Sequence, residues 1–227
     1  RCGIWFQDQH SSRFFFSSLY LYNFKDGIYW NGNTGGMLKN IFADSCNYGI
    51  MLTNSTQVTV DSAYLTNCSI AGIQIFTAKD CLFLNIHCYD CYKGIAFVAY
   101  SYGVTPGSLL SGFTCRDCAR GVEFDAAASG YERQMTVSNG IISANSTSAI
   151  AVYWGSSYGY APVTITNIRL LGQFDYGFRD NVSNASSDFV INLLMGVDAL
   201  NASFNTAAFD MPRLSEIREI GHNPGLL

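Results

Sequence analysis

Gly94-Ile95-Ala96-Phe97-Val98 is the stretch that decides the fold, because the same phrase returns along most of the chain. Successive copies begin 22 to 28 residues apart, and each has a small residue followed by alternating apolar and variable residues. The alternation predicts a short strand with one buried face, and the small residue predicts a crowded corner. The copies begin at Gly3, Gly27, Gly49, Gly72, Gly94, Gly121, Ala149 and Gly177.

A second phrase follows each copy and is itself preceded by another short alternating strand, such as Val58-Thr59-Val60. Each repeat is therefore predicted to contain three strands and three corners. Repeats of this length indicate a solenoid, and crossovers between parallel strands are right-handed. We expect an all-β, right-handed, single-stranded parallel β-helix with three sheets and about seven to eight coils. The solenoid is predicted over residues 1–196, with a capping segment over 197–227.

The repeat resembles the pectate-lyase-like superfamily over roughly residues 3–196, through the Gly-Ile strand, the long corner after it and an Asn column at a short corner. The resemblance implies a β-helix but no single activity, because the superfamily includes lyases, hydrolases, epimerases, phage tailspikes and inert structural domains. The family's catalytic signatures, such as Gly-His-Gly and Asn-Thr-Asp, are absent from the sequence, so no catalytic residue is transferred. The corner column reads Asn40, Ser62, Asn85, Gly112, Asn139 and Asn167.

Near the C-terminus, Gly221-His222-Asn223-Pro224-Gly225 resembles the phrase at which phage and bacterial β-helix proteins close. This resemblance favours an appendage or tailspike, for which a homotrimer or larger assembly is expected. Arg1 lies directly inside a predicted strand, which predicts that the chain is a piece of a larger protein.

Composition narrows the classes of partner. The 227 residues carry a net charge of −4 and only 13% charged residues, which disfavours nucleic-acid binding. No apolar run approaches the ~18 residues of a membrane-spanning helix. An extracellular location is expected, with a virion as the alternative. Six Asn-x-Ser/Thr triplets mark candidate glycosylation sites, at Asn54, Asn67, Asn145, Asn181, Asn184 and Asn201.

The cysteines fall into two columns of the repeat. Cys46, Cys68, Cys91 and Cys118 occupy one column, and Cys88 and Cys115 occupy the other. Adjacent coils are ~4.8 Å apart, which is within the Cα range of a disulfide. Stacked thiols or inter-coil disulfides are the favoured interpretation, with Cys88–Cys115 as the predicted bridge. The two Cys-x-x-Cys pairs also leave zinc binding and redox chemistry open, although no metal or cofactor is predicted.

The outward face of the Gly-Ile strand is where chemistry is expected. Glu123 and Asp125 form its only carboxylate pair and project from one face of one strand. Aligning Ile150 with Val122 places Ala151 beside Glu123 and Tyr153 beside Asp125, with Arg179 on the same face. The alternative is a solvated strand face without function.

The corners after this strand lengthen and become aromatic in the same region. Aromatic rings beside carboxylates suit sugar rings, so we predict that the protein binds polysaccharide. If it is an enzyme, it is a hydrolase or lyase with Glu123 and Asp125 as acid and base. The competing hypothesis is a non-catalytic structural or adhesive spike. The predicted substrate-binding residues are Arg179, Tyr100, Tyr102, Tyr131, Tyr153, Trp154, Tyr158 and Tyr160.

Overall fold

The computed structural model describes residues 1–7, 14–32, 34–99, 107–126, 135–155, 163–180, 193–210 and 217–220. These residues form sixteen β-strands and no helix. The strands are β1 (Cys2–Gln7), β2 (Phe15–Tyr22), β3 (Asp26–Asn31), β4 (Thr34–Asp44), β5 (Tyr48–Thr53), β6 (Thr56–Thr66), β7 (Ala71–Phe76), β8 (Leu82–Tyr89), β9 (Lys93–Ala99), β10 (Leu109–Arg116), β11 (Arg120–Ala126), β12 (Met135–Asn145), β13 (Ile150–Trp154), β14 (Val163–Asp180), β15 (Leu193–Asp210) and β16 (Ile217–Ile220).

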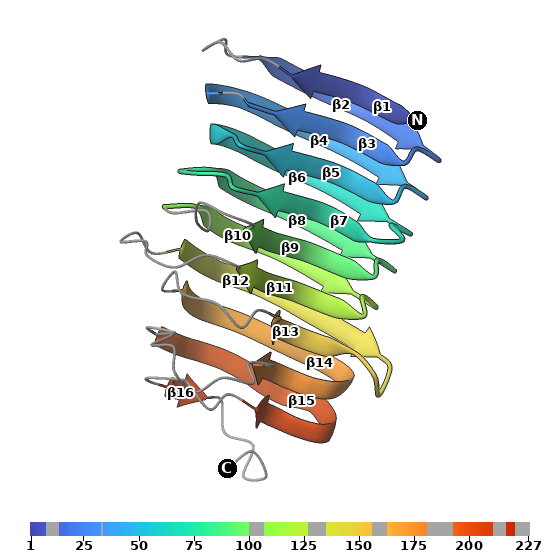
Figure 1. The fold of residues 1–227 in the computed structure, drawn as a ribbon. Coiled ribbons are helices and arrows are strands. Elements are labelled where there is room, and N and C mark those ends of the chain that lie inside the picture. Colours follow the sequence, from blue (N-terminus) through green and yellow to red (C-terminus); the bar gives the residue numbers. More distant parts are fainter. Residues whose placement is uncertain are drawn as a thin grey trace.

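Each strand from β1 to β12 pairs in parallel with the strand two positions later, so the chain winds as a β-helix. The odd-numbered strands from β1 to β13 lie one above another, as do the even-numbered strands from β2 to β12, and β14 joins the two stacks (Figure 1). The predicted parallel β-helix is therefore confirmed. It has about six turns, slightly fewer than predicted. At the C-terminal end, β14 and β15 each run through a corner as one 18-residue strand.

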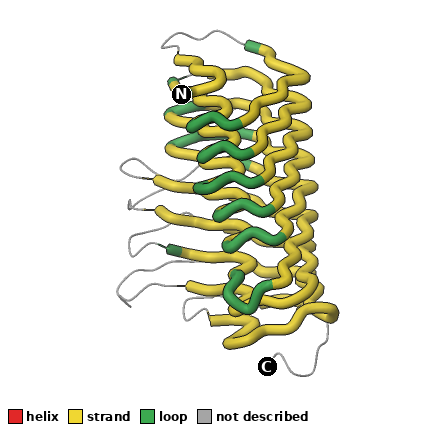
Figure 2. The backbone as a smooth tube through the Cα atoms, turned by 90° about the vertical axis from the view of Figure 1, so that its right-hand side faces the viewer, coloured by secondary structure: helices red, strands yellow, loops and turns green. Residues whose placement is uncertain are grey.

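The corner column found in the sequence is the bend that divides the even-numbered strands into two straight segments. Asn40, Asn85, Asn139 and Asn167 all have φ between 52° and 54°, in the left-handed region that Asn tolerates. Ser62 and Gly112 occupy the same bend in their coils, with φ of 61° and 68°. The amides of this column also bind one another between coils, because Nδ2 of Asn167 donates to Oδ1 of Asn139 at 2.7 Å. Figure 2 shows the corners of consecutive coils lying above one another.

The glycine that opens each odd-numbered strand is required by the neighbouring coil. A Cβ atom on Gly94 would lie 2.6 Å from the carbonyl oxygen of Gly121 and 2.7 Å from Sγ of Cys115. Both distances are shorter than non-bonded contacts allow. The sequence prediction of a corner without room for a side chain is therefore confirmed.

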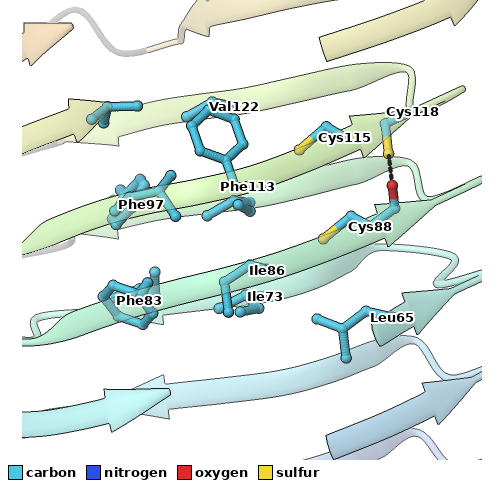
Figure 3. Packing of buried hydrophobic residues seen from close by; sticks show 14 of the residues in the cluster. Leu65, Ile73, Phe83, Ile86, Cys88, Phe97, Phe113, Cys115, Cys118 and Val122 are labelled. Atoms are coloured by element: carbon cyan, nitrogen blue, oxygen red, sulfur yellow. Dashed lines mark hydrogen bonds between the residues drawn. The ribbon is translucent and has the colours of Figure 1, made fainter. Parts of the chain in front are cut away.

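The interior is a continuous stack in which apolar or aromatic side chains of one coil lie on similar side chains of the next. Phe97 stacks on Phe124 with ring centroids 5.5 Å apart, and Phe124 stacks on Trp154 at 5.1 Å. Ile73, Phe83 and Val122 belong to the same cluster, which Figure 3 shows at close range. Burial of each such side chain contributes roughly 1.5–3 kcal/mol before entropy is subtracted.

The register of β13 differs by two residues from the sequence alignment. Val122 pairs with Val152 and Phe124 pairs with Trp154, whereas Ile150 pairs with Arg120. The alignment through Ile150 was therefore wrong at this coil. The physical reason is that β13 puts its largest apolar side chain, Trp154, into the slot above Phe124. The position of the glycine of other coils is therefore taken by Ala151, two residues after Ala149.

Parallel pairing continues beyond Gly196, the predicted end of the solenoid. Val197 pairs with Ile168, Phe209 pairs with Phe178, and β16 pairs in turn with β15. The Gly-Ile phrase fades in this region, but ladder hydrogen bonds depend on the backbone and do not need the phrase. Residues 211–216 and 221–227 lie outside the described residues.

Candidate functional site

The predicted carboxylate pair lies on the outward face of β11, but the part of this face around Glu123 is covered. Glu123 is only 1% exposed, Tyr153 is buried beside it, and Ala96 of the preceding coil is completely buried. The β-ladder aligns these residues in the order Gln74, Ala96, Glu123, Tyr153 and Arg179. The alternative of a solvated carboxylate face is therefore wrong for Glu123.

Two cations hold the buried Glu123. Lys93 Nζ lies 2.7 Å from one carboxylate oxygen, and Arg120 Nη1 lies 2.7 Å from the other. Lys93 and Arg120 are register partners at the starts of β9 and β11, each directly before the strand-opening glycine. A charge is buried at low cost only when it is paired and hydrogen-bonded, and this arrangement satisfies both oxygens of Glu123.

Two tyrosines flank Arg120. Its guanidinium carbon lies 4.1 Å from the ring centroid of Tyr153 and 5.7 Å from that of Tyr92. Although burial alone would lower it, the hydrogen bond and charge of Glu123 raise the pKa of Arg120. We define Lys93, Arg120, Glu123, Tyr92 and Tyr153 as the Glu123 cluster. Sequence analysis missed both cations, and the available signal was a basic residue directly before the glycine in two successive coils.

Asp125 has a different environment from Glu123. It is half-buried, and its register partner in β9 is the buried Val98. Burial, and then the negative charge of Glu123, raise the pKa of the Asp125 carboxyl above its ordinary value. The two carboxylates of one strand therefore lie in different environments, since both oxygens of Glu123 are engaged in ion pairs while Asp125 has a raised pKa. Such a separation is the usual arrangement when two carboxyl groups have different roles.

Polar atoms without partners lie at both ends of the ladder that contains Glu123. Among the described residues, the buried Nε of Arg179 has no hydrogen-bond partner, and neither does Oε1 of Gln74. The guanidinium of Arg179 also lies 4.3 Å from the ring centroid of Tyr176. Buried polar atoms in proteins are almost always paired. Trp30, Thr53 and Trp154 also carry such an unpaired atom, so Nε of Arg179 marks a candidate ligand contact only together with the other polar groups of its face.

The structure brings together only part of the predicted binding set. Tyr153 and Arg179 join the ladder of Glu123, and Tyr153 pairs with Glu123 instead of Asp125. Trp154 was predicted to contact substrate, and this is wrong, because it is buried in the core and stacks on Phe124. The other predicted aromatic residues lie outside the described residues, namely Tyr100, Tyr102, Tyr131, Tyr158 and Tyr160.

All eight cysteines are free, so the structure does not contain the predicted Cys88–Cys115 bridge. The two residues are register partners, as expected. Side chains of in-register parallel strands leave their backbones in the same direction, so their Cβ atoms stay about one coil spacing (~4.8 Å) apart, beyond the ~3.5–4.5 Å of a disulfide.

The thiols of the other column satisfy corner carbonyls. Cys46, Cys68, Cys91 and Cys118 each donate to the carbonyl two residues earlier, and Cys118 also donates to Cys88 (Figure 3). Hydrogen bonding with Cys91 and burial raise the pKa of Cys68 and of Cys118. The described residues include no group of three or more His, Cys, Asp or Glu side chains that could hold a metal ion. The thiols of this column therefore act as hydrogen-bond donors to backbone carbonyls at the corners.

The candidate glycosylation sites in the described part of the chain are exposed, at Asn54, Asn67, Asn145 and Asn201. The amides of Asn54 and Asn67 donate to the preceding coil, to Asn31 and Asp44. Asn181 and Asn184 lie outside the described residues, and modification remains a prediction at all six sites.

Comparison with protein-family models matches residues 1–169 to the family described as "Right handed beta helix region". The chain belongs to this right-handed β-helix family. Membership confirms the predicted handedness and agrees with the resemblance to the pectate-lyase-like superfamily, while the tailspike likeness remains a prediction. Neither the comparison with curated proteins nor that with solved structures found a match. In the described part of this β-helix, no helix is long and apolar enough to cross a membrane.

Proposed function

We propose that this β-helix binds a polysaccharide outside the cell or on a virion, through the outward face of β11, β13 and the end of β14. The observation that carries the proposal is the set of polar groups on this face: the half-buried Asp125, the partly exposed Arg120 and the unpartnered Nε of Arg179. Carboxylate and guanidinium groups bind sugar hydroxyls, and the exposed ring of Tyr92 adds an apolar surface.

Glu123 itself supports this face without contacting the ligand. Glu123 is almost completely buried and both of its carboxylate oxygens bind cations. It fixes Arg120 between Tyr92 and Tyr153, and a fixed guanidinium loses little conformational entropy when a ligand binds. Glu123 is therefore a positioning residue.

Cleavage of the bound polysaccharide is a second candidate function, favoured by the raised pKa of Asp125. A carboxyl group that stays protonated to higher pH can give its proton to the oxygen of a breaking glycosidic bond. Because both carboxylate oxygens of Glu123 are engaged by Lys93 and Arg120, Asp125 is the carboxyl group of the pair that we assign as the acid.

A glycan array and a reducing-end assay on one preparation test both functions. Arg179→Gln is expected to weaken binding about tenfold or more, because a guanidinium donor is lost. Asp125→Asn is expected to reduce turnover by at least ~100-fold while binding changes little. Asp198→Asn is the matched control, because Asp198 is a surface residue paired with Arg169 near the C-terminal end.

Binding without turnover in the wild type would leave binding as the function and remove cleavage. If the wild type neither binds nor cleaves any glycan, the proposal is overturned and a structural solenoid remains. Equal loss of binding in Arg179→Gln and Asp198→Asn would show that the assay reports stability and not contact.

A further inference from the structure

A second outward face carries aromatic residues in four consecutive coils. It lies on the C-terminal halves of β2, β4, β6 and β8, beyond the bend in each strand (Figure 1). The β-ladder aligns Tyr20, Phe42, Tyr64 and His87 in one column. The column beside it begins with Tyr22 and ends, three coils later, with Tyr89. We call these six residues the aromatic face.

These rings do not serve the interior. Tyr20, Tyr22 and Tyr64 are 67%, 57% and 45% exposed, while the residues that alternate with them, such as Leu21 and Leu65, are buried. Large side chains gathered in this way at the surface of a sheet are unusual, and they mark interaction sites.

The rings are held in an ordered array. Tyr20 stacks on Phe42 with centroids 4.8 Å apart and an interplanar angle of 7°. Tyr64 stacks on His87 at 4.7 Å and 16°. Ring carbons in contact are only ~3.5–4.0 Å apart, so rings that follow the coil spacing must be offset and keep part of their faces exposed. Each of these two stacked pairs is therefore ordered before any ligand binds.

Charge is nearly absent from the aromatic face. The only charged position in these two columns of the four coils is Asp44. Its Oδ1 accepts hydrogen bonds from Ser45, Thr66 and Asn67. These bonds, the one from Asn67 first, lower the pKa of Asp44. These two columns carry no cation to attract an anionic polymer, and their single carboxylate is already engaged by three donors, so the ligand that fits best is neutral.

The backbone excludes strand addition by a peptide over most of the face. β4, β6 and β8 are each paired on both sides, which leaves no free ladder edge within them. A ligand must then bind to side chains, and those available offer ring surface tipped with Tyr hydroxyls and a His nitrogen. Sugar rings combine apolar C–H faces with hydroxyls in the same way. One sugar residue of an extended chain also advances by a distance close to one coil spacing.

We propose that the aromatic face binds a neutral polysaccharide whose chain runs along the β-helix axis. The site is separate from the surface of the proposed function, the outward face of β11, β13 and the end of β14. We call that surface the Asp125 face. The ligand class rests in part on the proposed function, whereas the site itself rests on register, exposure and charge. Two separate faces would let the protein hold one polymer while the other face engages a second segment.

The test measures binding to insoluble cellulose and chitin by pull-down, and to soluble galactomannan and β-1,3-glucan by calorimetry. The Tyr20→Ala/Tyr64→Ala double variant is compared with wild type, and Tyr20→Phe/Tyr64→Phe keeps the rings. Ile141→Ala is the matched control, because Ile141 is an exposed residue two coils beyond His87 in the same column. The double Ala variant is expected to lose at least about tenfold in affinity for one of these glycans, while the Phe variant and the control retain binding.

Comparison with Arg179→Gln separates this inference from the proposed function. If only the double Ala variant loses binding, the aromatic face is the site and the proposed function of the Asp125 face is overturned. If only Arg179→Gln loses binding, the proposed function stands and this inference is overturned. Loss in both variants supports both sites, and no binding by the wild type overturns both.

The aromatic face could instead bind a second copy of the protein, and sedimentation would show this. If the wild type self-associates in sedimentation and the double Ala variant is monomeric, with no glycan bound, the face is an interface between copies and the inference is overturned. Ring-proton shifts of wild-type tyrosines on adding glycan give a second measurement that does not depend on any variant. Absence of such shifts would contradict the proposal.

Discussion

The guanidinium carbon of Arg120 lies 4.1 Å from the centre of the Tyr153 ring, although the two residues belong to different coils. The same guanidinium donates to Glu123, whose other oxygen binds Lys93 of the preceding coil. One cluster thus ties β9, β11 and β13 together on their outward faces. The cluster lies in the region where the corners that follow these strands become longer in the sequence. A longer corner constrains its flanking strands less, so contacts between coils matter more there.

Glu123→Gln is expected to destabilise the protein, because it leaves Lys93 and Arg120 close together without their carboxylate. Breaking a buried ion pair costs up to ~3–5 kcal/mol, and the partial exposure of both cations reduces this to about 2–4 kcal/mol. Urea unfolding measures the change. Lys39→Gln is the control, since the exposed Lys39–Asp61 pair should contribute only ~0–1 kcal/mol. Equal effects of the two substitutions would contradict the structural importance of the Glu123 cluster.

Phe97→Ala is expected to cost about 3–5 kcal/mol, because it empties a slot between Phe83 and Phe124 that the rigid coils cannot close. Phe42→Ala makes the same chemical change on an outward, half-buried residue and should cost less than about 1.5 kcal/mol. The comparison by thermal or urea unfolding tests which face of each strand is buried. A larger loss for Phe42→Ala would overturn the assignment of the core.

The fold was predictable because every coil of a β-helix has the same local requirements, so the same residue types recur at the same positions. A glycine before the strand, alternating apolar residues and an Asn or Gly at the bend each have a local physical cause that the sequence displays. The register of β13 could not be read in this way. The corner before it differs in length from earlier ones, and only packing of Trp154 onto Phe124 fixes which residue of β13 pairs with which residue of β11.

The candidate site was predictable only in part, because some of its features depend on packing between coils and not on local sequence patterns. The pairing of Glu123 with Asp125 on one strand face follows from strand periodicity. The two cations that neutralise Glu123 come from the strand starts, where the chain turns at a corner and alternation no longer tells which way a side chain points. The burial of the outward face likewise depends on tertiary contacts that no periodic pattern encodes.

Asn85→Ala is expected to cost about 1–2 kcal/mol, because the left-handed φ of 53° strains a residue with a Cβ and because the hydrogen bond to Asp61 is lost. Asn85→Gly should cost about 1 kcal/mol less than Asn85→Ala, since glycine adopts this conformation freely and Gly112 already does so in the next coil. Asn145→Ala is the control, an exposed residue outside the left-handed corners. If Ala and Gly at position 85 behave alike, the bend does not require a positive φ.

The cysteines are expected to remain reduced and protected. A thiol reagent should label only Cys2 in the folded protein, because the other seven side chains are buried, and all eight after unfolding. The raised pKa of Cys68, Cys88 and Cys118 slows the reaction further, since the thiolate is the reactive form. Intact mass with and without reduction checks the same point. A mass gain of two hydrogens on reduction would show a disulfide and contradict the expectation of eight free thiols.

Opposite pH dependences are expected for Asp125 and Asp44. The pKa of Asp125 is raised in the folded state by burial and by Glu123, so ionised Asp125 disfavours folding at neutral pH. Its favourable contribution is complete below the unfolded pKa of about 3.9 and is lost as the pH rises through the folded value. Asp125→Asn should therefore increase stability at pH 7 by up to about 1 kcal/mol, and this advantage should disappear toward pH 3.

Asp44 provides the contrast within the same protein. The amide of Asn67 donates to its carboxylate and lowers its pKa, so its contribution is present above about pH 4 and is lost as the pH falls through the folded value. Asp44→Asn should destabilise by about 0.5–1.5 kcal/mol at pH 7 and have little effect near pH 2. Urea unfolding of both variants and the wild type from pH 2.5 to 7 gives the two difference curves. Curves of the same sign would show that Asp125 is not shifted upward, and its assignment as the acid of the pair would fail with it.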